Sequence, residues 1–65
     1  MRLMSWVNAI KVGLESEGAT VFFQHTSLVQ DQMAVQISYD LGDNSYDHIF
    51  LVSENGVKDI GRTLR

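Results

Sequence analysis

Apolar and polar side chains alternate between residues 33 and 40, with the period of two that is typical of a half-buried β-strand. One face carries Met33, Val35, Ile37 and Tyr39, and the other carries Ala34, Gln36, Ser38 and Asp40. A short turn rich in polar residues occupies 41–45, and residues 46–53 form a second strand-like segment. The pattern predicts an antiparallel hairpin, around which we expect the rest of the chain to pack.

Before this hairpin, the apolar residues follow a helical period. They lie mostly three and four positions apart, at Leu3, Trp6, Val7, Ile10 and Leu14. The spacing predicts an amphipathic helix over residues 4–17, with Ser5 as a candidate N-cap and Gly18 in the left-handed position that ends it. Trp6 lies within the stripe and is expected to anchor the core. A close approach of helix to sheet would account for Gly13, which costs helix stability.

A first strand is predicted over residues 20–26, where β-branched and aromatic residues are frequent. Phe22 and Phe23 are adjacent, so one of the two rings must point away from the helix-covered side. The apolar pair at 28–29 either extends this strand to a tight turn at 30–31 or forms an exposed contact in a loop. We favour the longer strand.

Residues 49–52 are apolar on both faces of their strand. A strand of this kind is usually covered on both sides. We therefore expect either the C-terminal segment or a partner protein to cover the second face of the sheet.

The C-terminal segment allows two interpretations. Asn55-Gly56 is a strong hairpin turn, which would begin a fourth strand. Val57, Ile60 and Leu64 instead lie at helical spacing, although Gly61 weakens a helix. We favour a short C-terminal helix. The predicted fold is then a single α+β domain over residues 1–65, with an N-terminal helix packed on a three-stranded antiparallel meander sheet.

Composition indicates the number of domains and the compartment of the protein more clearly than its chemistry. A chain of 65 residues suits one domain, and it has no Cys for disulfides or thiolate metal sites. Its first residues do not resemble a signal peptide, and no apolar run approaches the roughly 18 residues that a membrane span needs. We expect a soluble, cytoplasmic protein.

Charge is unevenly distributed along the chain. The formal net charge is −3, yet no Lys or Arg occurs between Val12 and Val57. Seven acids lie in that window: Glu15, Glu17, Asp31, Asp40, Asp43, Asp47 and Glu54. The common interpretation is a solvated acidic face, and the functional one is a negative patch that meets a basic partner.

Candidate catalytic chemistry is sparse. His25 and His48 lie in different predicted strands, where their rings could share a face, but no third metal ligand is evident. Asp40, Asp43 and Asp47 could hold a cation weakly, although turn chemistry accounts for the polar residues between them. No known catalytic motif is present. We expect no enzymatic activity, no metal and no cofactor.

The sign of the charge also disfavours direct nucleic-acid binding, because such surfaces are basic. Carboxylates on a rigid sheet can instead stand in for phosphates against Arg and Lys. A compact chain of this length is about 28 Å across, a length over which duplex DNA carries roughly 16 charges. The acids therefore suit a short basic patch, with aromatic residues adding affinity. The expected partner-binding residues are Asp31, Asp40, Asp43, Asp47, Glu54, Tyr39 and Tyr46.

The chain resembles small phage-type anti-CRISPR proteins directed at type I-C systems. The resemblance lies in its length, its opening residues 1–8 (Met-Arg-Leu-Met-Ser-Trp-Val-Asn) and its acidic middle, and no diagnostic motif carries it. It implies a non-enzymatic inhibitor of the Cascade surveillance complex. Such a protein binds the site that reads the protospacer-adjacent motif (PAM), on the large subunit, and keeps target DNA out. We expect a monomer that binds neither nucleic acid nor a membrane.

The alternative is a small interaction module or homodimeric accessory subunit with a target unrelated to nucleic acid. It would pair through the apolar second face of the sheet, with Phe22 or Phe50 at the contact. A metal-dependent enzyme using His25 and His48 is a third and weaker hypothesis.

Overall fold

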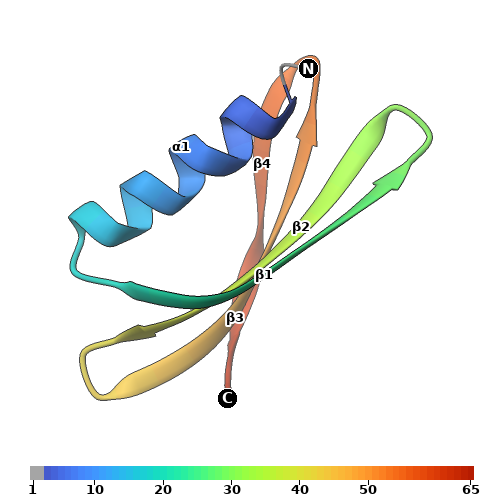
Figure 1. Ribbon diagram of the computed structural model, residues 1–65. Helices are drawn as coiled ribbons and strands as arrows, with labels where there is room; N and C mark the ends of the chain where they lie inside the picture. The colour runs from blue at the N-terminus through green and yellow to red at the C-terminus, as the bar shows by residue number, and fades with distance from the viewer. Residues whose placement is uncertain (1–2) are drawn as a thin grey trace.

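The computed structural model describes residues 3–65. A helix, α1 (Leu3–Ser16), is followed by the strands β1 (Thr20–Val29), β2 (Gln32–Leu41), β3 (Asn44–Ser53) and β4 (Gly56–Leu64). The strands form one antiparallel sheet in the order β1-β2-β3-β4, and α1 lies against one face of it (Figure 1). Within residues 3–65, no helix has the length and apolar content that crossing a bilayer requires.

The predicted α+β class, the N-terminal helix and the antiparallel meander are confirmed. The predicted C-terminal helix is wrong, because residues 56–64 form a fourth strand paired with β3. Gly56 and Gly61 have φ angles of 117° and 127°, which a right-handed helix does not contain. The turn signal at Asn55-Gly56 was therefore the correct indication.

A β-bulge explains the misleading helical spacing in β4. The register shifts between Ile49 and Phe50, so that Ile60 is an extra residue without a cross-strand partner. An extra residue reverses the alternation of faces along a strand. Val57 and Leu64 therefore lie on the same face although they are seven residues apart. A straight strand would place them on opposite faces.

The core forms where the alternating face of β2 meets α1. Met33, Val35, Ile37 and Tyr39 are all buried, as the pattern predicted. Their cross-strand partners in β3 are Val52, Phe50, His48 and Tyr46. Side chains of directly paired residues lie on one face of a sheet, so this helix-covered face contains both the apolar core and a buried histidine.

Only part of the predicted helical stripe faces the sheet. Val7 is 1% exposed, and Ile10 and Leu14 pack partly against the core. Trp6 is 43% exposed, so its predicted role as a core anchor is wrong. Adjacent helical residues point about 100° apart, and Val7 takes the inward direction. The side chain of Leu3 lies outside the described residues.

The helix ends were predicted with mixed success. The helix begins at Leu3, so Ser5 lies in its first turn and is not the N-cap. Gly18 ends it as predicted, with a φ of 102° and an amide that donates to the carbonyl of Glu15 at 3.0 Å. A Cβ added at Gly13 would meet nothing within 4 Å, so the predicted close approach there is wrong.

Strand β1 continues to Val29 and turns at Gln30–Asp31, which confirms the longer-strand interpretation. Phe22 is an extra residue in a bulge between Val21 and Phe23. Both phenylalanines line a hollow with Ser38 and Asp47 on the outer side of the sheet, and at the β1 edge they line a second hollow with Lys11 of α1. The bulge therefore lets two adjacent rings share one face, which regular alternation does not allow.

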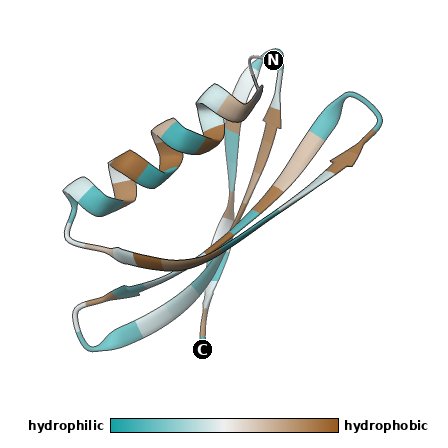
Figure 2. Ribbon diagram, in the orientation of Figure 1, coloured by the Kyte–Doolittle hydropathy of each residue, from teal (hydrophilic) through white to brown (hydrophobic). Residues whose placement is uncertain are grey.

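The second face of the sheet, called here the outer face, has no layer over it within residues 3–65. The C-terminal segment extends the sheet as β4 and does not cover it. Ile49 and Leu51 are half-buried on this face among their strand neighbours. Figure 2 shows hydrophobic residues along α1 and early β1, with hydrophilic residues at the turns.

Candidate functional site

Three of the predicted site residues gather in the hairpin formed by β2 and β3. Asp40 pairs with Ser45 across the strands, and Ser38 pairs with Asp47. Asp40 and Asp47 are therefore diagonal neighbours on the outer face, where such Cα atoms lie about 7–8 Å apart. Asp43 occupies the turn between the strands. We call Asp40, Asp43 and Asp47 the acidic hairpin.

Hydrogen bonds hold two of these carboxylates in place. The Ser45 hydroxyl donates to Oδ1 of Asp40. The Ser38 hydroxyl donates to Oδ1 of Asp47 at 2.6 Å and accepts from Nε2 of Gln36 at 3.3 Å. Because these partners lie on regular strands, the carboxylates have restricted orientations before any partner arrives.

The terminal basic residues neutralise this hairpin only in part. Strand β4 runs toward it, and Nε of Arg65 lies 3.6 Å from Oδ1 of Asp47. Within residues 3–65, no Lys, Arg or His nitrogen lies within 4.0 Å of the carboxylates of Asp40 or Asp43. Among the described residues, the hairpin therefore presents two carboxylates without a cationic partner and one in a loose ion pair.

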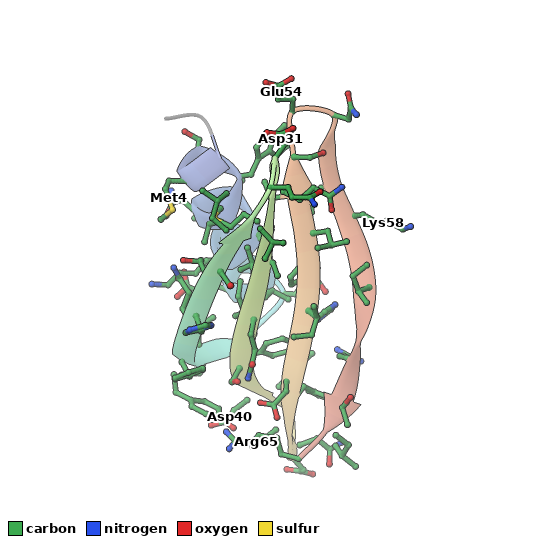
Figure 3. All side chains as sticks on the ribbon, turned by 90° about the vertical axis from the view of Figure 1, so that its right-hand side faces the viewer. Met4, Asp31, Asp40, Glu54, Lys58 and Arg65 are labelled. Atoms are coloured by element: carbon green, nitrogen blue, oxygen red, sulfur yellow. The ribbon has the colours of Figure 1, made fainter. Side chains whose placement is uncertain are left out.

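The other two predicted acids lie elsewhere. Asp31 and Glu54 belong to the β1–β2 and β3–β4 turns, which share the end of the sheet opposite Asp43. Figure 3 shows Asp31 and Glu54 at one end, and Asp40 with Arg65 at the other. The longest dimension of the molecule is 36 Å. The five predicted acids therefore do not form one continuous surface.

The two predicted tyrosines also lie away from the outer face. Tyr39 is fully buried on the helix-covered face. Tyr46 is half-buried on the same face, with the Arg62 guanidinium 4.0 Å above its ring. Neither ring lies on the face that carries Asp40 and Asp47. The tyrosines stabilise the sheet behind the acidic hairpin.

A polar chain that the sequence did not predict connects three strands on the helix-covered face, with Tyr39 and His48 buried in its middle and Arg62 and Asp59 exposed at its ends. Nη1 of Arg62 donates to Oη of Tyr39 at 3.1 Å. Oη of Tyr39 lies 2.8 Å from Nδ1 of His48. Nε2 of His48 lies 2.8 Å from Oδ1 of Asp59. Two of these residues, Arg62 and Asp59, belong to β4 and lie on either side of its bulge.

Arginine can only donate, so the Tyr39 hydroxyl accepts from Arg62. One arrangement that satisfies the remaining partners has the Tyr39 hydroxyl donating to Nδ1 of His48 and Nε2–H of His48 donating to the Asp59 carboxylate. The hydrogen bond to Tyr39 raises the pKa of Arg62 above its ordinary value, which keeps this donor charged.

This chain has the chemistry of a structural link. Tyr39 is fully buried and His48 is 8% exposed, and their polar atoms are taken up by hydrogen bonds to each other and to Arg62 and Asp59. Its partners on β4 hold that edge strand against β2 and β3. The sequence contained one signal, because the alternation of β2 places Tyr39 on the core face, where a hydroxyl needs a partner.

The two histidines do not come together, contrary to the expectation that they could share a face. His25 pairs with Gln36 on the outer face, and His48 pairs with Ile37 on the helix-covered face. Among the residues that the structure describes, no group of three or more His, Cys, Asp or Glu could hold a metal ion. Comparison with protein-family models, curated proteins and solved structures gives no match.

Proposed function

We propose that this protein is a non-enzymatic inhibitor that binds a basic protein surface through its acidic hairpin. The resemblance to type I-C anti-CRISPR proteins supplies the identity of the partner. On this proposal the target is the Cascade complex, at the PAM-reading site of its large subunit. The bound protein keeps target DNA from that site and touches no nucleic acid itself.

The observation that carries the proposal is the environment of the Asp40 and Asp43 carboxylates. Both are exposed at one end of the sheet, and neither has a cationic partner within residues 3–65. Asp40 is already oriented by the Ser45 hydroxyl. Preorganised carboxylates lose little freedom when they meet Arg or Lys, so more of the electrostatic attraction remains as binding energy.

The size of the hairpin restricts what it can imitate. The molecule measures 36 × 20 × 16 Å. Duplex DNA carries roughly 12 charges along 20 Å of its axis. Three carboxylates cannot replace that density, so the hairpin suits a site that reads a few base pairs. The remaining affinity must come from apolar contacts on the outer face.

A DNA-capture assay with purified type I-C Cascade tests the proposal. Cascade is incubated with saturating protein, and labelled target duplex with the correct PAM is then added. The proposal predicts loss of the Cascade–DNA complex in a gel shift. Capture of DNA at the normal level would contradict the proposal. Loss of the complex only when the protein is mixed with the DNA before Cascade is added would also contradict it.

A second candidate function is supported by the exposed apolar residues of the outer face. Phe22 and Phe23 are each about half-exposed, and Ile60 is 50% exposed. An interaction module or homodimer could bury them against another chain. Phe50, which was expected at such a contact, is instead 6% exposed in the helix-covered core. Light scattering distinguishes the two candidates by molecular mass. F22S/F23S would dissociate a dimer and would leave the mass of a monomer unchanged.

A further inference from the structure

Arg65 lies at the edge of the acidic hairpin and contacts both an aromatic ring and a carboxylate. Its Cζ atom lies 5.4 Å from the centroid of the Phe22 ring. Its Nε atom lies 3.6 Å from Oδ1 of Asp47. A ring face and a carboxylate are the two surfaces that a planar guanidinium recognises best.

These groups surround a hollow of about 380 Å³ on the outer face. Phe22, Phe23, Gln36, Ser38, Asp47 and Arg65 line it. Ser38 lies at the base, where it is 1% exposed and donates to Asp47 at 2.6 Å. The carboxylate is therefore held in position by a buried hydroxyl, with its other oxygen free to accept from a cation.

Arg65 fits this hollow loosely. A well-formed charge-assisted hydrogen bond has a length of about 2.7–2.9 Å, and the Nε–Oδ1 separation here is 3.6 Å. The backbone amide of Arg65 is fixed by a 2.8 Å bond to the Ser45 carbonyl, which limits how far its side chain can advance. The side chain remains 49% exposed. An arginine that entered from solvent would not have this restriction.

We infer that Phe22, Asp47 and Ser38 form a binding site for an arginine side chain of the partner protein, and that Arg65 occupies it as an internal competitor. The inference rests on the proposed function and names the chemistry that the partner must offer. Binding is an exchange, in which the partner's guanidinium replaces that of Arg65. Lysine is a poorer ligand, because its ammonium cannot stack on the ring and pair in two positions with the carboxylate.

An NMR titration with N-acetyl-L-argininamide tests the site without Cascade, and N-acetyl-L-lysinamide serves as the matched probe. The argininamide is expected to shift the amides of Phe22, Ser38 and Asp47 and to bind several-fold more tightly than the lysinamide. In R65Q the competing charge is gone. If Arg65 fills the site most of the time, its removal strengthens the apparent affinity by about 3-fold or more.

Two further variants in the R65Q background test the walls of the site. F22L keeps an apolar side chain but removes the ring, and D47N keeps the shape but removes the charge. Each is expected to weaken argininamide binding by about 2–5-fold or more, and an unchanged urea midpoint shows that folding is intact. Equal binding of both probes, or no gain in R65Q, would overturn the inference. If the protein inhibits Cascade but does not bind argininamide, this inference alone is refuted. If it binds argininamide but does not inhibit Cascade, only the proposed function is refuted.

Discussion

Tyr39 and His48 are joined by a buried 2.8 Å hydrogen bond between Oη and Nδ1. The two residues are diagonal neighbours on β2 and β3, because Tyr39 pairs with Tyr46 and Ile37 pairs with His48. The bond connects the alternating strand of the core to the polar chain that fixes β4. It is therefore a specific determinant of the four-stranded sheet on which the acidic hairpin is built.

The first prediction concerns this bond. In Y39F, Nδ1 of His48 loses its hydrogen-bond partner in a buried setting, and the exposed Arg62 loses the Tyr39 hydroxyl as its acceptor. We expect the free energy of unfolding to fall by about 1–3 kcal/mol, measured by urea denaturation.

The matched control is Y46F. The Tyr46 hydroxyl has one exposed contact with Asn44, at 3.4 Å, so its removal should change stability by less than about 0.5 kcal/mol. Equal effects of the two substitutions would show that this polar chain does not stabilise the fold.

The second prediction compares two glycines. Gly61 has a φ of 127° in the β4 bulge, where an added Cβ is strained, so G61A should destabilise the protein by about 1–3 kcal/mol. Gly13 is helical, and a Cβ there meets nothing within 4 Å. G13A should therefore stabilise it by up to about 1 kcal/mol. Thermal unfolding measures both, and changes of the same sign would contradict the assigned conformations.

The third prediction concerns adjacent residues of α1. Val7 is 1% exposed against the sheet, and Trp6 is 43% exposed. V7A should cost about 2 kcal/mol of unfolding free energy through lost burial and a residual cavity. W6A removes a larger side chain but should cost less, since much of the indole remains in water. A greater loss in W6A would mean that Trp6, and not Val7, anchors the helix.

Local periodicity predicted the elements that follow one regular repeat. The alternation from Met33 to Tyr39 continues without a bulge, so the buried face of β2 could be predicted residue by residue. The bulge at Ile60 reverses the alternation of faces along β4. The spacing of the apolar residues in this strand therefore resembled that of a helix. Bulges depend on pairing with a neighbouring strand, which a single segment does not encode.

The candidate site was harder to predict, because it depends on which turns share an end of the sheet. In a four-stranded meander, successive turns alternate between the two ends. Asp31 and Glu54 therefore lie together, opposite Asp43, although all belong to the same acidic window of the sequence. The same topology brings Arg65 beside Asp47, so charges that are segregated along the chain become neighbours in space.

The fourth prediction concerns the proposed electrostatic contact with Cascade. D40K/D43K reverses the charge of the two hairpin carboxylates that have no cationic partner within residues 3–65. D31K/E54K makes the same change in net charge at the opposite end of the sheet and serves as the control. If both variants bind Cascade as tightly as the original protein at all salt concentrations, neither end of the sheet makes the contact.

The most direct measurement is the Cascade affinity of these two variants, determined side by side by biolayer interferometry. Because close charge pairs at an interface contribute about 1.5 kcal/mol or more each, D40K/D43K should weaken binding more than about 100-fold. D31K/E54K should stay within about 3-fold of the original protein, since isolated exposed charges outside a contact have small effects. Tight binding by D40K/D43K, or equal losses in the two variants, would contradict recognition through the acidic hairpin.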